Sequence, residues 1–186
     1  WVHPEYGNIY PDEFIHVLEE SGQILELDAF IWERACQYIR KWQDAGYRMP
    51  LSINLSRKDV HGHGLLEQLV ELTNKYQIDR ELLHLEITES AYMNNPEELI
   101  EIVEELTMVG FHVEMDDFGS GYSSLNMLKN VPVQTIKLDW RFVDDLEENS
   151  KAGNIIGSVV RMAHGLGMRV ISEGVETRQQ ADFLKN

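Results

Sequence analysis

Five short segments of the chain alternate apolar and polar residues with a period of two, which is the side-chain spacing of a β-strand. They are Leu51–Leu55, Leu83–Ile87, Phe111–Asp116, Val133–Asp139 and Met168–Glu173. Segments with helical periodicity lie before, between and after them, at 11–20, from just after Asp28 to near Gly46, and at 65–76, 96–109, 149–165 and 177–184. Strands that alternate with helices predict βα units, and therefore a parallel sheet in a single domain.

The polar positions of these strands do not fit a parallel sheet with helices on both faces, because such strands are apolar throughout. In these segments one face is mainly apolar and the other mainly polar, although Ser172 and Ile171 depart from this in the last, and the ionisable groups fall near the strand ends. A closed parallel barrel accounts for this pattern, since helices cover its outside and the polar face points inward. The residues expected at its C-terminal rim, where barrel enzymes have their active sites, are Asn54, Glu86, Asp116, Lys137 and Glu173.

Five strands are too few for such a barrel, which needs about eight. The chain is therefore predicted to be incomplete at one or both ends.

Oxygen atoms dominate the set of side chains expected at this rim. Four carboxylates and one amide favour a hard cation, Mg²⁺ or Mn²⁺, over zinc, and they belong to Glu86, Asp116, Asp117, Glu173 and Asn54. Asp116 and Asp117 are adjacent, so one can bridge two cations while the other binds only the second. Two cations roughly 3.5–4 Å apart are the usual arrangement for in-line attack of an activated water on a phosphodiester.

Lys137 could orient that water or neutralise charge in the transition state. The competing interpretation is that these groups form salt bridges inside the barrel. One clear lysine is too few counter-ions for four carboxylates, which favours the metal site.

A glycine- and serine-rich segment, 118–125, follows the paired aspartates. Its residues Gly119, Ser120 and Gly121 allow a tight loop. The loop could cradle a phosphate or close over the metal ions, and glycines at this spacing do not decide between the two.

Composition restricts the functional classes further. The chain has 186 residues, with 16 Lys and Arg against 32 Asp and Glu, and a formal net charge of −16. This charge disfavours duplex nucleic acid as a partner, although bound cations can reverse the local field around an anionic ligand. The single cysteine, Cys36, cannot form an internal disulfide. The sequence shows no signal peptide and no apolar run of membrane-spanning length. We therefore expect a cytoplasmic domain.

The motifs along the chain stand in the order found in bacterial EAL domains, and the chain resembles that family over essentially its whole length. They are Asn54-Leu-Ser56, Glu86-Ile-Thr-Glu89-Ser90, Asp116-Asp-Phe-Gly-Ser-Gly-Tyr-Ser-Ser-Leu125, Ile136-Lys-Leu-Asp139 and Ser172-Glu-Gly-Val-Glu-Thr177. The resemblance implies a TIM-type (β/α)8 barrel with one strand of atypical direction. It also implies hydrolysis of cyclic di-GMP to linear pGpG with two divalent cations, Mg²⁺ or Mn²⁺.

The resemblance further implies a role for individual residues. The first metal would be held by Asn54, Glu86 and Asp116, and the second by Asp116, Asp117 and Glu173. Lys137 would contact the nucleophilic water. Glu173 would also act as general base, secondary to its metal role.

Three further residues are expected beside this site. Asp139 would be a neighbour of Lys137, Glu89 would anchor the loop 118–125, and Glu176 would lie in the second shell or touch the substrate. In the family this loop links the site to dimerisation, so a homodimer is expected, with sensory or GGDEF domains as possible fusions.

Residues 1–186 are thus expected to form one EAL domain that lacks its outermost strands. The Glu-Ala-Leu signature would lie just before Trp1, and its glutamate is a ligand of the first metal in the family. The last barrel strand would follow Asn186. We therefore expect the sequence to be part of a longer chain.

Two other functions remain open from the residues. The first is a catalytically inactive receptor that binds cyclic di-GMP and signals through a partner. The second is a metal-assisted barrel lyase with a Schiff base at Lys137, which the surrounding carboxylates disfavour because they raise the pKa of that amine. Among the histidines, His61 and His63 are expected in a solvated loop, and His84 and His112 as hydrogen-bonded residues of the barrel interior.

Overall fold

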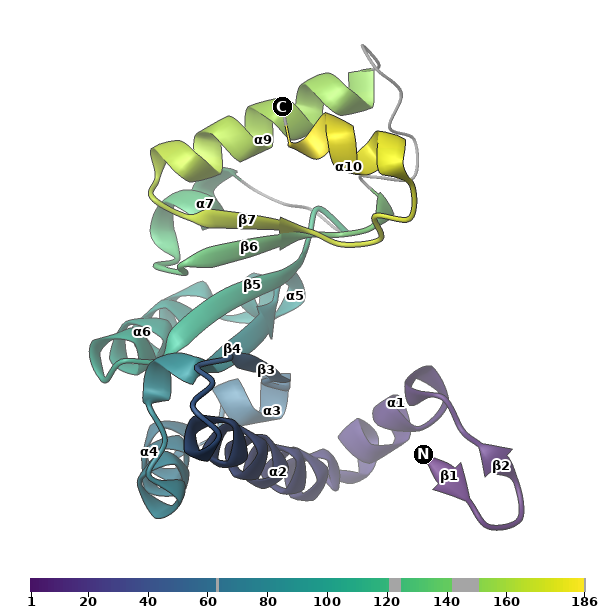
Figure 1. Cartoon of the computed structure of the whole chain (residues 1–186), viewed down its shortest axis with the longest axis vertical. Helices are drawn as coiled ribbons and strands as arrows, with labels where there is room; N and C mark the ends of the chain where they lie inside the picture. The colour runs from purple at the N-terminus through teal and green to yellow at the C-terminus, as the bar shows by residue number, and fades with distance from the viewer. Residues whose placement is uncertain (63, 121–124, 142–150, 186) are drawn as a thin grey trace.

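The central element is a five-stranded parallel sheet, curved so that helices line its outer side (Figure 1). We describe it from a computed structural model that covers residues 1–62, 64–120, 125–141 and 151–185. In sheet order the strands are β3 (Leu51–Asn54), β4 (Leu83–Thr88), β5 (His112–Phe118), β6 (Thr135–Leu138) and β7 (Arg169–Ser172). All four pairings between them are parallel, so no strand of atypical direction is among these five. The predicted α/β class, an incomplete TIM-type barrel, is confirmed.

Helices follow the strands in the βα order that the sequence predicts. In the described part of the chain they are α1 (Pro11–Ser21), α2 (Ile24–Asp44), α3 (Arg57–Val60), α4 (Leu65–Tyr76), α5 (Glu89–Asn94), α6 (Pro96–Met108), α7 (Leu125–Asn130), α9 (Lys151–Gly165) and α10 (Arg178–Leu184), with a 3-10 turn at Arg80–Leu82. The first residues of the predicted helix 149–165 lie outside the described residues. None of the helices described is both long enough and apolar enough to cross a bilayer.

The N-terminal segment stands away from the sheet. Strands β1 (Val2–His3) and β2 (Gly7–Asn8) form a small antiparallel hairpin, and α1 has no buried residue. Figure 1 shows both extending from the start of α2. The sequence did not predict the hairpin, nor the short helices α3 and α5.

The hydrophobic core lies between the outer face of the sheet and the helices. Ile53, Leu85, Val113 and Ile136 come from four successive strands, and each is at most 2% exposed. They are the outward positions of the predicted alternation, which is therefore confirmed. Because the apolar side chains of the strands pack into this core, the polar side chains lie on the inner face of the sheet.

Helix α2 begins earlier than the sequence predicts. A start after Asp28 was expected, but the helix begins at Ile24 and Asp28 lies inside it. Asp28 does not cap the helix, because it lies in the second turn, and its side chain is buried, as is that of Asp59 in α3, whose charge acts on it. One turn later, Trp32 donates its indole N–H to the carbonyl oxygen of Asn54 at 3.2 Å. Helix α2 thus holds the end of β3, where Asn54 lies.

The buried Asp28 makes stability depend on pH. Burial, followed by the hydrogen bond and the charge of Asp59, raises the pKa of Asp28 from 3.8 to about 7. The folded chain therefore binds this proton more tightly than the unfolded chain, and the contribution of Asp28 to stability is lost as pH rises from about 4 to about 7.

Asp28→Asn is expected to raise the free energy of unfolding at pH 8 by about 2 kcal/mol, and by much less at pH 5. Urea denaturation at the two pH values measures this. The exposed Asp12→Asn serves as the control and should show no such pH dependence. An equal effect of Asp28→Asn at both pH values would contradict the assignment.

Candidate active site

Lys137 on β6 lies at the centre of a cluster of carboxylates on the inner face of the sheet. Its Nζ lies 3.0 Å from Glu86 Oε1, 3.0 Å from Asp116 Oδ1 and 2.7 Å from Glu173 Oε1. These acids come from β4, from β5 and from the residue directly after β7. Four predicted site residues from four neighbouring strand ends are therefore brought together.

The cluster is largely withdrawn from solvent. The side chains of Glu86, Lys137 and Asp116 are 12%, 13% and 17% exposed, whereas that of Glu173 is 38% exposed. Burial opposes the charge of Lys137, but its hydrogen bonds to Glu173, Glu86 and Asp116 outweigh burial and raise the pKa of the amine. Lys137 is therefore an ammonium group at neutral pH. A protonated amine is not a nucleophile, which argues against a Schiff base at this position.

A β-bulge separates the two aspartates that end β5. Met115 pairs with Ile136 and Phe118 pairs with Leu138, so three steps along β5 match two along β6. Asp117 is the extra residue of the bulge and has a left-handed conformation with φ of 54°. Strict alternation would place Phe118 on the inner face, but the bulge returns it to the outer core, where it is 3% exposed.

The bulge also keeps Asp117 near the other acids. Partial burial, together with the negative charges of Asp116, Asp139 and Glu173, raises the pKa of Asp117, and Lys137 partly offsets them. The backbone N–H of Asp117 donates to Asp116 Oδ1 at 3.0 Å. Both aspartates thus belong to one electrostatic cluster, although their neighbouring positions in a regular strand would separate them.

Asn54 and Asp139 lie on either flank of the cluster. Asn54 is in register with Glu86 across the β3–β4 pair, so its side chain shares the inner face. Asp139 follows β6, is 3% exposed, and accepts a hydrogen bond from the backbone N–H of Arg141 at 2.8 Å. The guanidinium of Arg141 lies 3.7 Å from the same oxygen.

Glu89 contacts the start of the glycine-rich loop. It is 3% exposed, and its Oε2 accepts a hydrogen bond from the N–H of Gly119 at 3.0 Å. Ser120 donates its N–H to the carbonyl oxygen of Asp117 at 3.0 Å. The loop residue Gly121, also predicted for the site, lies outside the described residues.

Glu176 is not joined to the cluster by the contacts that the structure describes. It is exposed beside the N-terminus of α10, where its N–H donates to Gln180 Oε1 at 2.9 Å. This bond belongs to the capping of α10, so the structure adds no support for Glu176 as a substrate contact.

A family model described as "EAL domain" matches residues 1–186, which is the whole chain. The chain belongs to the EAL domain family. The EAL domain is 38% identical over 174 residues to "Signaling protein YkoW" of Bacillus subtilis, covering 94% of this chain and 22% of that protein. It is 32% identical over 185 residues to "Bifunctional diguanylate cyclase/cyclic di-GMP phosphodiesterase MucR" of Pseudomonas aeruginosa, covering 99% and 27%.

A solved structure described as "PaMucR Phosphodiesterase, c-di-GMP complex" shares the fold of this EAL domain. The TM-score is 0.93 at 32% identity, with 100% of this chain and 75% of that one covered. The chain spans about a quarter of the length of the two curated relatives named above.

A second group of ligand-type side chains lies one layer further into the EAL domain. Among the described residues, atoms that could serve as metal ligands gather at His84, His112 and Glu114, all within 4.8 Å of one another. The sequence predicted His84 and His112 as hydrogen-bonded interior residues, and the contacts confirm this. Glu114 was missed as their partner, although it shares their face of the predicted strands.

Proposed function

We propose that this EAL domain hydrolyses cyclic di-GMP to linear pGpG with the help of divalent cations. The observation that carries the proposal is the convergence of Glu86, Asp116 and Glu173 on protonated Lys137 at the C-terminal rim of the sheet. The names of the relatives support it, since MucR is called a cyclic di-GMP phosphodiesterase and the solved PaMucR structure a c-di-GMP complex.

The donor set fits Mg²⁺ or Mn²⁺. Every candidate ligand offers oxygen, which hard cations prefer. Asn54, Glu86 and Asp116 are proposed to hold one cation, and Asp116, Asp117 and Glu173 a second. When bound, the cations would activate water and neutralise charge on the phosphodiester.

Lys137 is proposed to act as a fixed cation. Its three carboxylate contacts restrain the ammonium, so little reorganisation is needed when negative charge develops on the phosphoryl oxygens or the attacking water. Glu173 is the most exposed of the three acids in contact with Lys137. It is proposed to accept a proton from the attacking water, in addition to its proposed metal role. The same ion pairs hold the carboxylates in place before the substrate arrives.

The bulge at Asp117 and the contact of Glu89 with Gly119 are proposed to position the loop. Glu89 is buried and fixes the first residue of the turn, so the loop begins at a defined place beside the paired aspartates. The substrate anion would then enter a site whose acids are screened by Lys137 and by the cations.

Direct assay of the product tests the proposal. The full-length protein, incubated with cyclic di-GMP and Mg²⁺, is expected to release pGpG, detected by liquid chromatography, and excess EDTA is expected to abolish product formation. Mn²⁺ added beyond the chelator should restore it. Calorimetry that shows binding of cyclic di-GMP without turnover would instead support the receptor function.

The partners are also proposals. We expect a homodimer, which light scattering measures, and further signalling domains in the same protein. The second expectation rests on the greater length of the relatives and on the bifunctional cyclase and phosphodiesterase name of MucR.

A further inference from the structure

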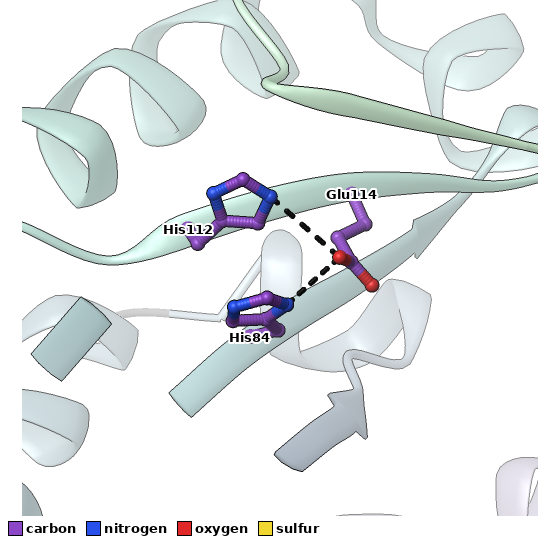
Figure 2. A group of neighbouring side chains, drawn as sticks. All are labelled: His84, His112 and Glu114. Atoms are coloured by element: carbon purple, nitrogen blue, oxygen red, sulfur yellow. Dashed lines mark hydrogen bonds and ion pairs between the residues drawn. The ribbon is translucent and has the colours of Figure 1, made fainter. Parts of the chain in front are cut away.

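Two histidines and a glutamate form a compact group on the same face of the sheet as the carboxylate cluster. Figure 2 shows the three side chains. His84 on β4 and His112 on β5 are direct register partners, with ring centroids 4.2 Å apart. Glu114 follows His112 by two residues on the same strand, so it shares their face. Figure 2 shows both rings turned toward the same carboxylate.

The three ligand atoms all lie within 4.8 Å of one another, and their two distances to Glu114 Oε1 are close to those expected around a small tetrahedral cation. His84 Nδ1 lies 2.8 Å and His112 Nε2 lies 3.6 Å from Glu114 Oε1. Around Zn²⁺, ligand atoms at about 2.1 Å from the metal are about 3.4 Å from one another in tetrahedral geometry. Both observed distances are within about 0.6 Å of that value, which small rotations of the side chains can supply.

We infer that His84, His112 and Glu114 form a zinc site in the interior of this EAL domain, with the fourth position open to water. Two imidazoles and one carboxylate are a common three-ligand set for Zn²⁺. The site is separate from the proposed Mg²⁺ or Mn²⁺ site, because its nitrogen ligands favour transition metals over hard cations.

Neighbouring residues hold the proposed ligand side chains in place before a metal binds. Ser52 donates its hydroxyl to Glu114 Oε2 at 3.2 Å, which orients the carboxylate and leaves Oε1 for the metal. Glu114 is 3% exposed, and the two histidines are 15% and 17% exposed.

The competing interpretation is a hydrogen-bonded network without a metal. His84 Nδ1 can donate to Glu114, and His112 Nε2 shares a hydrogen bond of 2.8 Å with Thr135 Oγ1. This network explains the contacts of each residue. A shared cation would account for the same orientation of both imidazoles toward one carboxylate oxygen.

Zinc titration by calorimetry separates the two interpretations. The full-length protein is titrated with Zn²⁺ in excess Mg²⁺, which keeps the oxygen-only site occupied. The affinity for one equivalent of Zn²⁺ is expected to fall by on the order of 100-fold or more in each of three variants, His84→Gln, His112→Gln and Glu114→Gln. His61→Gln is the matched control, because His61 contacts Glu98 in a more exposed His–Glu pair and should bind zinc as the wild type does.

Binding of Co²⁺ in place of Zn²⁺ provides a second readout. A site with two imidazoles and few ligands is expected to give strong visible absorption bands, which Asp116→Asn leaves unchanged. Absence of a Zn²⁺ equivalent in the wild type, its persistence in His112→Gln, or its loss in Asp116→Asn would each overturn the inference. None of these outcomes depends on whether the domain hydrolyses cyclic di-GMP.

Discussion

Replacing Lys137 by methionine is expected to lower kcat for cyclic di-GMP hydrolysis by roughly 10³-fold, because it removes the fixed ammonium group from the transition state. Methionine has a similar length and keeps the packing of the stem. The proposed metal ligands all remain, so affinity for Mg²⁺ should be maintained or increased. The expected signature is therefore a loss in kcat without a loss of metal binding.

The same substitution should also destabilise the metal-free domain. Glu86 and Asp116 are largely buried and would face Glu173 without a counter-charge. Loss of one partner from a buried ion pair costs several kcal/mol, and partial exposure of Glu173 reduces this to about 2 kcal/mol. Saturating Mg²⁺ should recover much of that loss in a urea denaturation experiment.

Lys129→Met is the matched control, since Lys129 lies exposed on α7. It should leave kcat and stability close to the wild-type values. Full activity in Lys137→Met, or an equal loss in Lys129→Met, would refute the role assigned to Lys137.

Much of the fold follows from local sequence pattern. Alternation identifies the strands because the outer face must be apolar to pack against helices, as Ile53 and Leu85 do. The same period places Glu86 and Lys137 on the inner face, and parallel pairing brings them to 3.0 Å. Pattern alone is sufficient here because parallel strands in one sheet align their carboxyl ends.

The sequence pattern gives a wrong prediction where contacts between distant segments determine the local structure. Asp28 has the chemistry of an N-cap, yet α2 begins four residues earlier, and both Asp28 and Asp59 of another helix are buried. At Asp117, the period of two is broken by a bulge whose position depends on the register with β6. The contact of Glu114 with two histidines depends on the register of β4 and β5, because this register places His84 beside His112. None of these contacts is encoded in nearby sequence.

Gly174→Ala is expected to reduce both stability and activity, because the residue after Glu173 approaches another backbone closely. Gly174 has φ of +68°, and an added Cβ would lie 2.5 Å from Trp140 Cβ and 3.1 Å from Trp140 Cα. These are atoms near the main chain, which cannot swing away as the end of a side chain can. The backbone at 173–174 must therefore move.

Such a movement acts directly on the site. The N–H of Glu173 donates to the carbonyl oxygen of Leu138 at 3.1 Å, and its carboxylate lies 2.7 Å from Lys137 Nζ. Shifting this segment breaks the ion pair that closes the cluster on the β7 side. We expect kcat to fall by roughly 10²-fold, since displacement of a positioned group by about 1 Å has that effect.

The matched control is Gly167→Ala, because Gly167 has a similar φ of +81° but no atom within 4 Å of the added Cβ. Both variants suffer the strain of a left-handed alanine, about 1 kcal/mol. Gly174→Ala should lose about 2 kcal/mol more through the clash. Urea denaturation and steady-state kinetics on the two proteins measure the difference, and equal behaviour of the pair would show that contact with Trp140 does not position Glu173.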